Sequence, residues 1–438
     1  MTKVCAKSMM AVAITGVLLC STAASAKVDI QHWQTQDGSR VFFVHAPQLP
    51  MVDVEVRFDA GSARDGQHWG QASLTAALIG TSTAQMNEEQ ISSAFNHLGA
   101  QFSSDADRDS ASIHLRSLTR PAILKSALST FSQVVSGSKF QPAILERERN
   151  RLMIALKQRS VQPSAILSKH LWHDLYGNHP YGHPVDGTLE TVPKISAKML
   201  EAFYQRYYVA RNAQVSIVGN VTLSQAKKIA EQVTSGLPVG QKPAPLPSPA
   251  LTHQAKKDVI PFKSTQTYYA LSQIGIQRGE PDYAALFVGN HLLGGSGFGS
   301  LLMENVREKR GLVYSVYSYF APMKVSGPFL IGLSTKNATA KEADQVVRQT
   351  LEAFLEGFSD SKLQAIKDNL IGGFPLRMDN NSKILGYISM IGFYHLPLDY
   401  LEWFPKQIAA VSKEDILKAW RKHVHPDKMV MVMVGQPK

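Results

Sequence analysis

An arginine and a tyrosine seven positions apart follow a glycine-rich stretch in the last third of the chain. The guanidinium of Arg307 is a permanently charged fork of hydrogen-bond donors, and the phenol of Tyr314 is a neutral donor at neutral pH. The stretch before them, Gly294-Gly295-Ser296-Gly297-Phe298-Gly299, has a flexible backbone that another chain can approach closely. It matches neither a P-loop nor a dinucleotide-binding fingerprint. A plain loop before a capped helix would also account for it.

The residues after the glycines predict a helix that carries Arg307. Apolar residues recur at helical spacing between Ser300 and Arg310, and Gly311 is a typical helix stop. Tyr314 comes shortly after that stop. The helix and the segment that follows it must therefore position the pair.

Predicted strands and helices are mixed along the rest of the chain. Apolar patterns predict strands over 52–58, 111–115 and 215–218. Small apolar residues predict a helix over 70–81, and Asn87 is a typical cap for a helix that ends at Gly99. Pro142 is a good first residue for a long helix over 143–159.

A proline-rich segment divides the chain into two halves that resemble each other. Five prolines between Leu237 and Pro249 indicate a stiff, extended linker. The segment from 195 to 219 is echoed from 411 to 435, an offset of 435 − 219 = 216 residues between the closing glycines. The expected fold class is α+β, with two similar domains, each a mixed, mostly antiparallel sheet backed by helices. The predicted boundaries are 1–26 for a leader, 27–236 and 259–438 for the domains, and 237–258 for the linker.

The glycine loop, the pair after it and the two-domain repeat resemble the pitrilysin/insulinase family of zinc peptidases. The similarity covers essentially the whole chain after the leader, and it is to the two-domain branch that includes mitochondrial processing peptidase. In that family a glycine-rich loop precedes an Arg, with a Tyr seven positions on, and the pair acts on the substrate carbonyl. The resemblance implies catalytic roles for Arg307 and Tyr314. It also implies substrate contacts at Gly294, Gly295, Gly297 and Gly299.

The zinc site that this resemblance implies has lost its ligands. Active members carry His-x-x-Glu-His on a first-domain helix, and a Glu on a later helix completes the set. Here Ser73, Ala76 and Ala77 stand at the three motif positions, and Ala155 stands at the later one. Glu148 retains a carboxylate that supports the site in the family. Methyl groups cannot ligate a metal, so we expect no cofactor in this chain and zinc in a partner subunit.

No histidine rebuilds the motif elsewhere in the sequence. None has Glu three positions later or directly after it, so the motif is absent in both directions. His170, His173, His179 and His183 fall in one tract, but neither pair has the spacing and third ligand of a catalytic zinc site. The run from His179 to Pro184 is similar to an ordinary loop of the family. We expect structural roles for these histidines.

The first 26 residues predict export. Lys3 and Lys7, an apolar run over 9–20 and Ala24-Ser25-Ala26 are typical of a signal peptide cleaved after Ala26. The run is too short to span a bilayer, and Leu19 before Cys20 argues against a lipid anchor. We therefore expect a periplasmic protein without a membrane anchor.

The mature chain should contain no cysteine, because Cys5 and Cys20 leave with the leader. This excludes disulfides, cysteine nucleophiles and cysteine-ligated zinc. Loss of Lys3 and Lys7 lowers the formal charge from +11 to +9. The remaining basic residues are scattered, with no run that alternates with aromatic residues, so we expect no nucleic-acid partner.

Two functions from different classes fit these observations. The chain resembles the substrate-handling, non-zinc subunit of a two-subunit metallopeptidase, which would form a heterodimer with a homologous subunit that carries the zinc motif. Arg307 and Tyr314 would then act on the peptide substrate. Alternatively, the chain is a catalytically inert pseudo-peptidase that binds peptides or serves as a scaffold. A structural ion pair and a buried tyrosine would then explain the pair.

Overall fold

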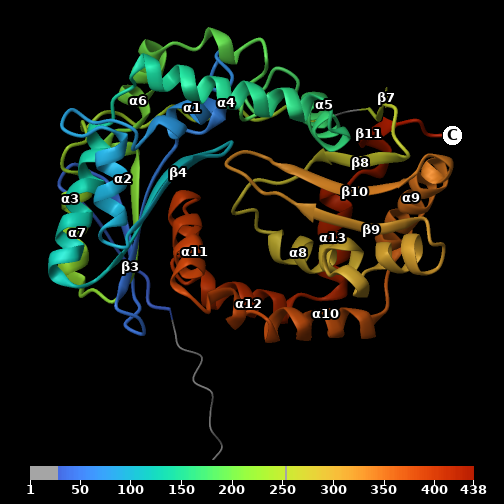
Figure 1. Cartoon of the computed structure of the whole chain (residues 1–438). Helices are drawn as coiled ribbons and strands as arrows, with labels where there is room; N and C mark the ends of the chain where they lie inside the picture. Colours follow the sequence, from blue (N-terminus) through green and yellow to red (C-terminus); the bar gives the residue numbers. More distant parts are fainter. Residues whose placement is uncertain (1–27, 252–253) are drawn as a thin grey trace, which may run out of the picture.

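Two sheets, one in each half of the chain, form the framework of the molecule (Figure 1). The structure is a computed structural model that describes residues 28–251 and 254–438, so the predicted leader lies outside the described residues. The first sheet has the strand order β1-β2-β6-β3-β5-β4 and the second has the order β7-β11-β8-β10-β9. The first sheet consists of β1 (Gln31–Gln34), β2 (Arg40–His45), β3 (Met51–Phe58), β4 (Gln101–Ala106), β5 (Ala111–Leu118) and β6 (Ala213–Gly219). The second consists of β7 (Lys256–Pro261), β8 (Gln266–Ile274), β9 (Val313–Phe320), β10 (Pro328–Lys336) and β11 (Val430–Gly435).

The two sheets repeat one topology, which confirms the predicted fold class. Strands β2 and β6 pair in parallel, as do β7 and β11, and the other neighbours are antiparallel. The closing glycines of the repeat adopt the same unusual backbone, with φ of +155° at Gly219 and +154° at Gly435. A Cβ would lie 2.6 Å from Cα of Val52 in the first sheet and 2.7 Å from Oγ1 of Thr267 in the second. Only glycine fits at both positions.

The helices of the first half begin at residues that favour a helix start. Pro121, Pro142 and Pro163 occupy the first helical positions of α3, α4 and α5. Asn87 accepts from the N–H of Gln90 at 2.9 Å, and Gln90 caps Asn87 in return. The helices are α1 (Gln71–Leu78), α2 (Glu88–Asn96), α3 (Pro121–Gly137), α4 (Pro142–Ser160), α5 (Pro163–Tyr176), α6 (Ala197–Tyr207) and α7 (Leu223–Thr234).

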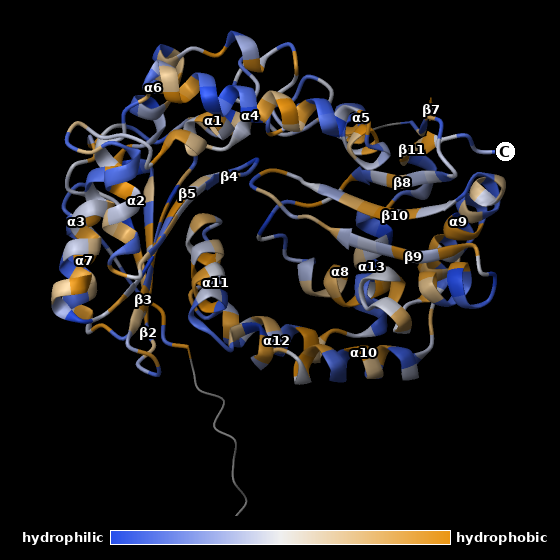
Figure 2. Cartoon of the chain, viewed as in Figure 1, coloured by the Kyte–Doolittle hydropathy of each residue, from blue (hydrophilic) through white to orange (hydrophobic). Residues whose placement is uncertain are grey.

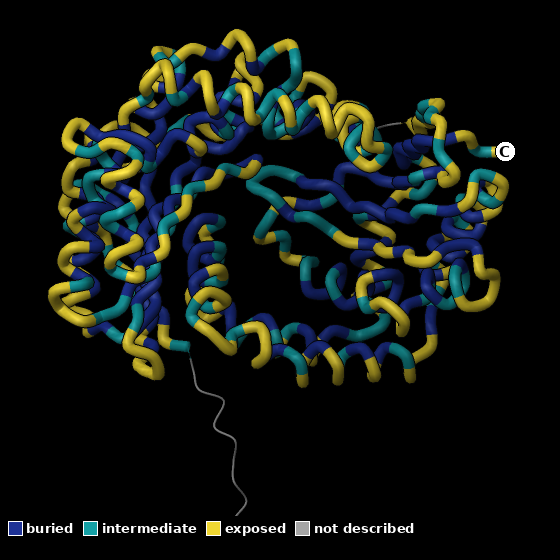
Figure 3. Tube along the Cα trace, in the orientation of Figure 1, coloured by how far each residue is buried: buried dark blue, intermediate teal, exposed yellow. Residues whose placement is uncertain are grey.

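Most helices of the second half lie on one side of the second sheet or along the lower edge of the molecule in Figure 1. Apolar and polar residues alternate along α10 and α12 (Figure 2), which is typical of helices that bury one side. Figure 3 shows buried residues concentrated on the strands. The helices are α8 (Tyr283–Asn290), α9 (Ala340–Glu356), α10 (Asp360–Gly372), α11 (Asn381–Phe393), α12 (Tyr400–Ala410) and α13 (Lys413–His423).

One helix from each half of the chain packs on the sheet of the other half. Helix α11 lies against β2, β3 and β6, where the side-chain amide of Gln214 donates to the carbonyl of Ser389 at 2.9 Å. Helix α5 lies against β8 and β11, where Leu171 and Leu175 pack in one apolar cluster with Val432. These two helices occupy equivalent positions in the repeat. The predicted boundaries 27–236 and 259–438 separate the two sheets, and each half contains one helix that packs on the sheet of the other half.

The proline-rich segment is extended, as predicted, but it is shorter than expected. Residues 240–251 have no helix or strand, whereas β7 begins at Lys256 and pairs with β11. The last three residues of the predicted linker, 256–258, thus belong to the second sheet. Within the described residues, no helix is long and apolar enough to cross a membrane.

Candidate functional site

Two of the loop glycines allow the chain before Arg307 to pack tightly. A Cβ at Gly294 would lie 2.8 Å from the backbone nitrogen of Ser318 on β9, and one at Gly295 would lie 2.6 Å from Nδ2 of Asn290. Gly297 has φ of +66° and has open space around its Cα. Gly294 is buried, so packing against β9 explains it. Substrate contact at the exposed Gly295, Gly297 and Gly299 stays a prediction.

The helix that carries Arg307 is wider than the regular helix predicted for this segment. Met303–Glu308 forms π-helical turns, in which the N–H of Lys309 donates to the carbonyl of Glu304 at 2.9 Å. Gly311 has φ of +62° and ends the helix, as predicted. Such wide turns are frequent at functional sites because they rotate a side chain out of the regular helical array. Here they set the direction of Arg307.

The structure brings Arg307 and Tyr314 together, with Phe298 as a third member of the group. The guanidinium carbon of Arg307 lies 4.6 Å from the ring centre of Phe298 and 5.0 Å from that of Tyr314. Both rings are exposed, Phe298 at 68% and Tyr314 at 84%. No carboxylate of the described residues forms an ion pair with Arg307. The cation is held by aromatic faces, and its N–H groups are left for another partner.

Strand β9 continues this group as an exposed row of tyrosines. Tyr317 and Tyr319 are stacked with ring centres 6.1 Å apart, and both rings are about half exposed. Gly332 on β10 makes room for the Tyr317 ring, because a Cβ there would lie 2.7 Å from its hydroxyl. β9 is the outer strand of its sheet, so its free edge can accept an added strand. We did not predict Phe298, Tyr317 or Tyr319, although the three tyrosines within 313–320 could have indicated an aromatic surface on this strand.

At the degenerate metal position, an ion pair takes the place of ligands. Ser73 on α1 donates to Oδ1 of Asp186 at 2.7 Å, and Arg159 on α4 forms an ion pair with the other oxygen of Asp186. Ala76 is buried, Ala77 is exposed and Ala155 is half-buried. The Ser73 hydroxyl, the only polar side chain at the four predicted metal positions, is therefore already hydrogen-bonded to Asp186 beside the Arg159 guanidinium. These residues do not fit a zinc ion.

Two carboxylates near this position have structural partners. Asp65 accepts from the backbone N–H groups of Gly70 and Ala72, both at 2.8 Å, and so caps α1. Glu148 is buried and pairs with Arg147 at 2.8 Å and Arg151 at 3.0 Å. The arginine partners account for Glu148, and its predicted role in supporting a metal site stays a prediction.

The histidine tract is tied into the framework. His170 hydrogen-bonds to Asp258 of β7 at 2.8 Å, and His179 contacts the carbonyl of Pro247 at 2.8 Å, which fixes the linker. His183 stacks on Trp69 with ring centres 5.2 Å apart. His173 lies in the last turn of α5. These contacts agree with the structural roles predicted for the tract.

One other group among the described residues has metal-ligand character. Glu280, Asp282 and His423 bring ligand atoms within 4.8 Å of one another. The ammonium of Lys422, however, already lies 2.7 Å from Asp282. The Lys422 ammonium therefore already supplies a positive charge to these acidic side chains.

Comparison with known proteins finds that the chain is similar to one family. Residues 40–189 match the model described as insulinase (peptidase family M16), and residues 194–370 match the peptidase M16 inactive domain. A crystal structure of a peptidase M16 inactive domain from Pseudomonas fluorescens is 38% identical, with a TM-score of 0.90 over 94% of this chain and 99% of that one. The curated relatives are more distant. The non-peptidase homolog YmxG of Helicobacter pylori is 24% identical over 89% of this chain and 90% of its own length. The uncharacterized zinc protease YmxG of Bacillus subtilis is 25% identical over 81% and 86%.

Proposed function

This chain belongs to the M16 (insulinase) family of peptidases, and on that premise we propose that it is the non-zinc subunit of a heteromeric periplasmic peptidase. Its substrates are peptides or unfolded segments. The chain supplies substrate binding and the Arg307–Tyr314 pair. A homologous exported subunit with an intact zinc motif supplies the metal, because Ser73, Ala76, Ala77 and Ala155 cannot bind it.

The exposure of the pair carries this proposal. The scaffold alternative would explain Arg307 by a structural ion pair and Tyr314 by burial. Tyr314 is instead 84% exposed, and Arg307 has no ion-pair partner among the described residues. An exposed tyrosine over a guanidinium adds little to folding, because an exposed cation–π contact is worth about 0.5–1 kcal/mol. The pair is therefore available to another molecule.

The chemistry of the pair suits a peptide carbonyl. The exposed Tyr314 hydroxyl can donate a hydrogen bond to an oxygen that gains negative charge. The Arg307 fork, fixed between two rings, can orient that carbonyl. An extended peptide added to the free edge of β9 would pass the stacked Tyr317 and Tyr319 and reach the pair. Backbone pairing would give affinity for many sequences, which suits an enzyme for unfolded segments.

Kinetics of the reconstituted complex test this proposal. The partner is sought among neighbouring genes that encode an exported chain with His-x-x-Glu-His, and co-expression should give a heterodimer that buries well over about 1,000 Å². Tyr314→Phe removes one oxyanion donor and should lower kcat about 100- to 1,000-fold with little change in KM. Arg307→Lys should raise KM, since an ammonium lacks the planar fork. Tyr268→Phe, which deletes a tyrosine hydroxyl on β8 in the interior of the sheet, is the matched control and should have little effect.

Near-wild-type turnover of Tyr314→Phe would favour the second candidate, a catalytically inert protein that binds peptides. The stacked row of Tyr317 and Tyr319 beside a free edge supports that candidate, because aromatic stacking and strand addition bind peptides without chemistry. In that case Tyr317→Ala should weaken peptide binding. Tyr314→Phe should change neither peptide binding nor the catalytic turnover of a partner enzyme.

A further inference from the structure

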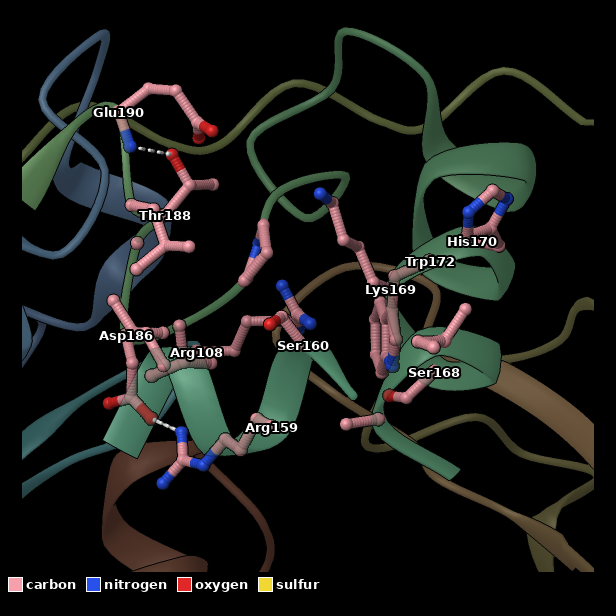
Figure 4. A pocket seen from close by; sticks show the side chains of 17 residues that line it. Arg108, Arg159, Ser160, Ser168, Lys169, His170, Trp172, Asp186, Thr188 and Glu190 are labelled. Carbon is pink, nitrogen blue, oxygen red and sulfur yellow. Dashed lines mark hydrogen bonds and ion pairs between the residues drawn. The ribbon is translucent and has the colours of Figure 1, made fainter. Parts of the chain in front are cut away.

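A cavity of about 400 Å³ lies beside the degenerate metal position (Figure 4). Its walls are the end of α4, the first turns of α5 and the loop 184–190. Leu156, Ile166 and Val185 give it an apolar lining, and the indole of Trp172 forms one side. This volume is within the range of small-molecule sites.

Arg108 brings a buried positive charge to this cavity. It comes from the turn between β4 and β5, is only 9% exposed and stacks on the Trp172 ring, with its guanidinium carbon 3.6 Å from the ring centre. Its Nη1 donates to the carbonyls of Tyr181 and His183 at 2.7 and 2.6 Å. Within the described residues, no carboxylate forms an ion pair with Arg108, and no acceptor is bonded to its Nε or Nη2.

This arrangement is costly without an anion. Burial lowers the pKa of Arg108 to about 10, which reflects the loss of hydration around the charge. Carbonyls satisfy two hydrogen bonds but carry no net charge. A bound anion would use the free N–H groups and balance the cation in a partly enclosed, low-dielectric site.

The carboxylates nearest to Arg108 have other partners, because Asp109 accepts from the hydroxyls of Tyr181 and Tyr394 and Asp107 lies 3.8 Å from Nη1 of Arg57. Asp186 is neutralised by Arg159, and Glu190 is exposed at the rim. Lys169 lines the cavity from α5, beside Trp172 in Figure 4. The cavity thus combines two cations, Arg108 and Lys169, with an aromatic and aliphatic wall.

We propose that this cavity binds an organic carboxylate with an apolar body. The carboxylate contacts Arg108 and Lys169, and the body lies against Trp172 and the aliphatic side chains. Such a ligand is either a free carboxylic acid or the C-terminal end of a peptide with an apolar last residue. The site needs neither the partner subunit nor the Arg307–Tyr314 pair, so it can exist whether or not the proposed function is correct.

Isothermal titration calorimetry of the purified chain tests this site with two probe acids and their neutral counterparts. Octanoate represents the free acid, N-acetyl-L-phenylalanine represents a peptide C-terminus, and octanamide and N-acetyl-L-phenylalaninamide lack the charge. We expect at least one acid to bind, and its amide to bind about tenfold more weakly or worse, because charge-assisted hydrogen bonds are lost. Binding of octanoate alone identifies the free acid as the source, and binding of N-acetyl-L-phenylalanine alone identifies the peptide end.

Variants locate the binding in the cavity without disturbing Arg108, which also holds the loop near Tyr181. Lys169→Ala should weaken the acid about three- to tenfold, whereas Lys228→Ala, an exposed lysine on α7, should not. Ala165→Phe keeps every charge but fills the cavity and should abolish binding, with an unchanged circular dichroism spectrum. The proposal is wrong if neither acid binds at millimolar concentration. It is also wrong if the amides bind equally well, or if the folded Ala165→Phe variant binds like the wild type.

Discussion

Gly392→Ala should destabilise the whole molecule, because helix α11 touches the first sheet at this residue. A Cβ there would lie 2.7 Å from Cδ2 of Phe42 and 2.7 Å from Oε1 of Gln214, distances that Cβ contacts do not reach without a shift of the neighbours. Phe42 and Gln214 are buried, and Arg40 donates to the Gly392 carbonyl at 2.6 Å, so the helix cannot easily retreat. Overpacking of this kind costs about 1–3 kcal/mol. Alanine regains about 0.5–1 kcal/mol of helix propensity. We expect a net loss of about 1–2 kcal/mol.

Gly386→Ala on the same helix is the matched control. Gly386 is exposed, and a Cβ there would meet no atom within 4 Å. Only the propensity effect applies, so this variant should gain about 0.5–1 kcal/mol. Urea unfolding followed by tryptophan fluorescence and circular dichroism measures both free energies of unfolding. If the two variants are equally stable, α11 does not pack on the first sheet as described, and the exchange of helices between the halves is refuted.

Two further predictions concern charge and metal. Burial raises the pKa of Asp53, but hydrogen bonds from His114 and Arg116 outweigh it and hold this pKa below its usual range. Because the pKa of Asp53 is lower in the folded state, the ionised carboxylate stabilises the fold at a pH above the unfolded pKa near 4. This stabilisation is lost as the pH falls through the folded-state pKa. Asp53→Asn should therefore cost about 1–3 kcal/mol at pH 7, and unfolding measured from pH 7 to 3 should show the deficit shrinking below about pH 4. Elemental analysis of the purified chain should find no stoichiometric zinc, and one tightly held zinc per chain with chelator-sensitive peptidase activity would contradict the assignment of the degenerate site.

Local features of this fold could be predicted from the sequence because neighbouring residues determine them. Asn87 caps α2, and Pro142 opens α4, as predicted. Gly219 and Gly435 end equivalent strands in equivalent conformations, so the repeat could be recognised without a structure. Each of these predictions needed only the chemistry of a short segment.

The exchange of helices could not be predicted in the same way. The apolar composition of α11 indicates that the helix is largely buried, but it does not say which sheet covers it. The contact that decides it joins Gln214 to Ser389, 175 positions apart in the chain. Predicted boundaries based on a linker therefore separated helices from the sheets they cover.

The candidate sites were predicted in their positions but not in their surroundings. Arg307 and Tyr314 do lie together, yet Phe298 and the π-helical turns that set their geometry were missed. At the metal position, the sequence showed only what was absent. Asp186, which now bonds Ser73, lies 113 positions away and belongs to a loop with no recognisable motif. A contact between residues so far apart in the chain cannot be read from the spacing of residues in a motif.

The shared helices have a consequence for how the chain is made. A chain synthesised from its N-terminus presents β2, β3 and β6 long before α11 appears. The face of the first sheet that carries Glu55, Arg57 and Gln214 therefore stays open until residue 393 has emerged. That interval is the period of greatest risk of aggregation, because sheet faces and edges are exposed to other chains. A gene split at the linker would create two polypeptides, each with an uncovered sheet, that fold only by finding one another. The covalent joining of the two halves thus keeps each sheet and the helix that covers it in one chain, whereas the proposed partner subunit can remain a separate gene product.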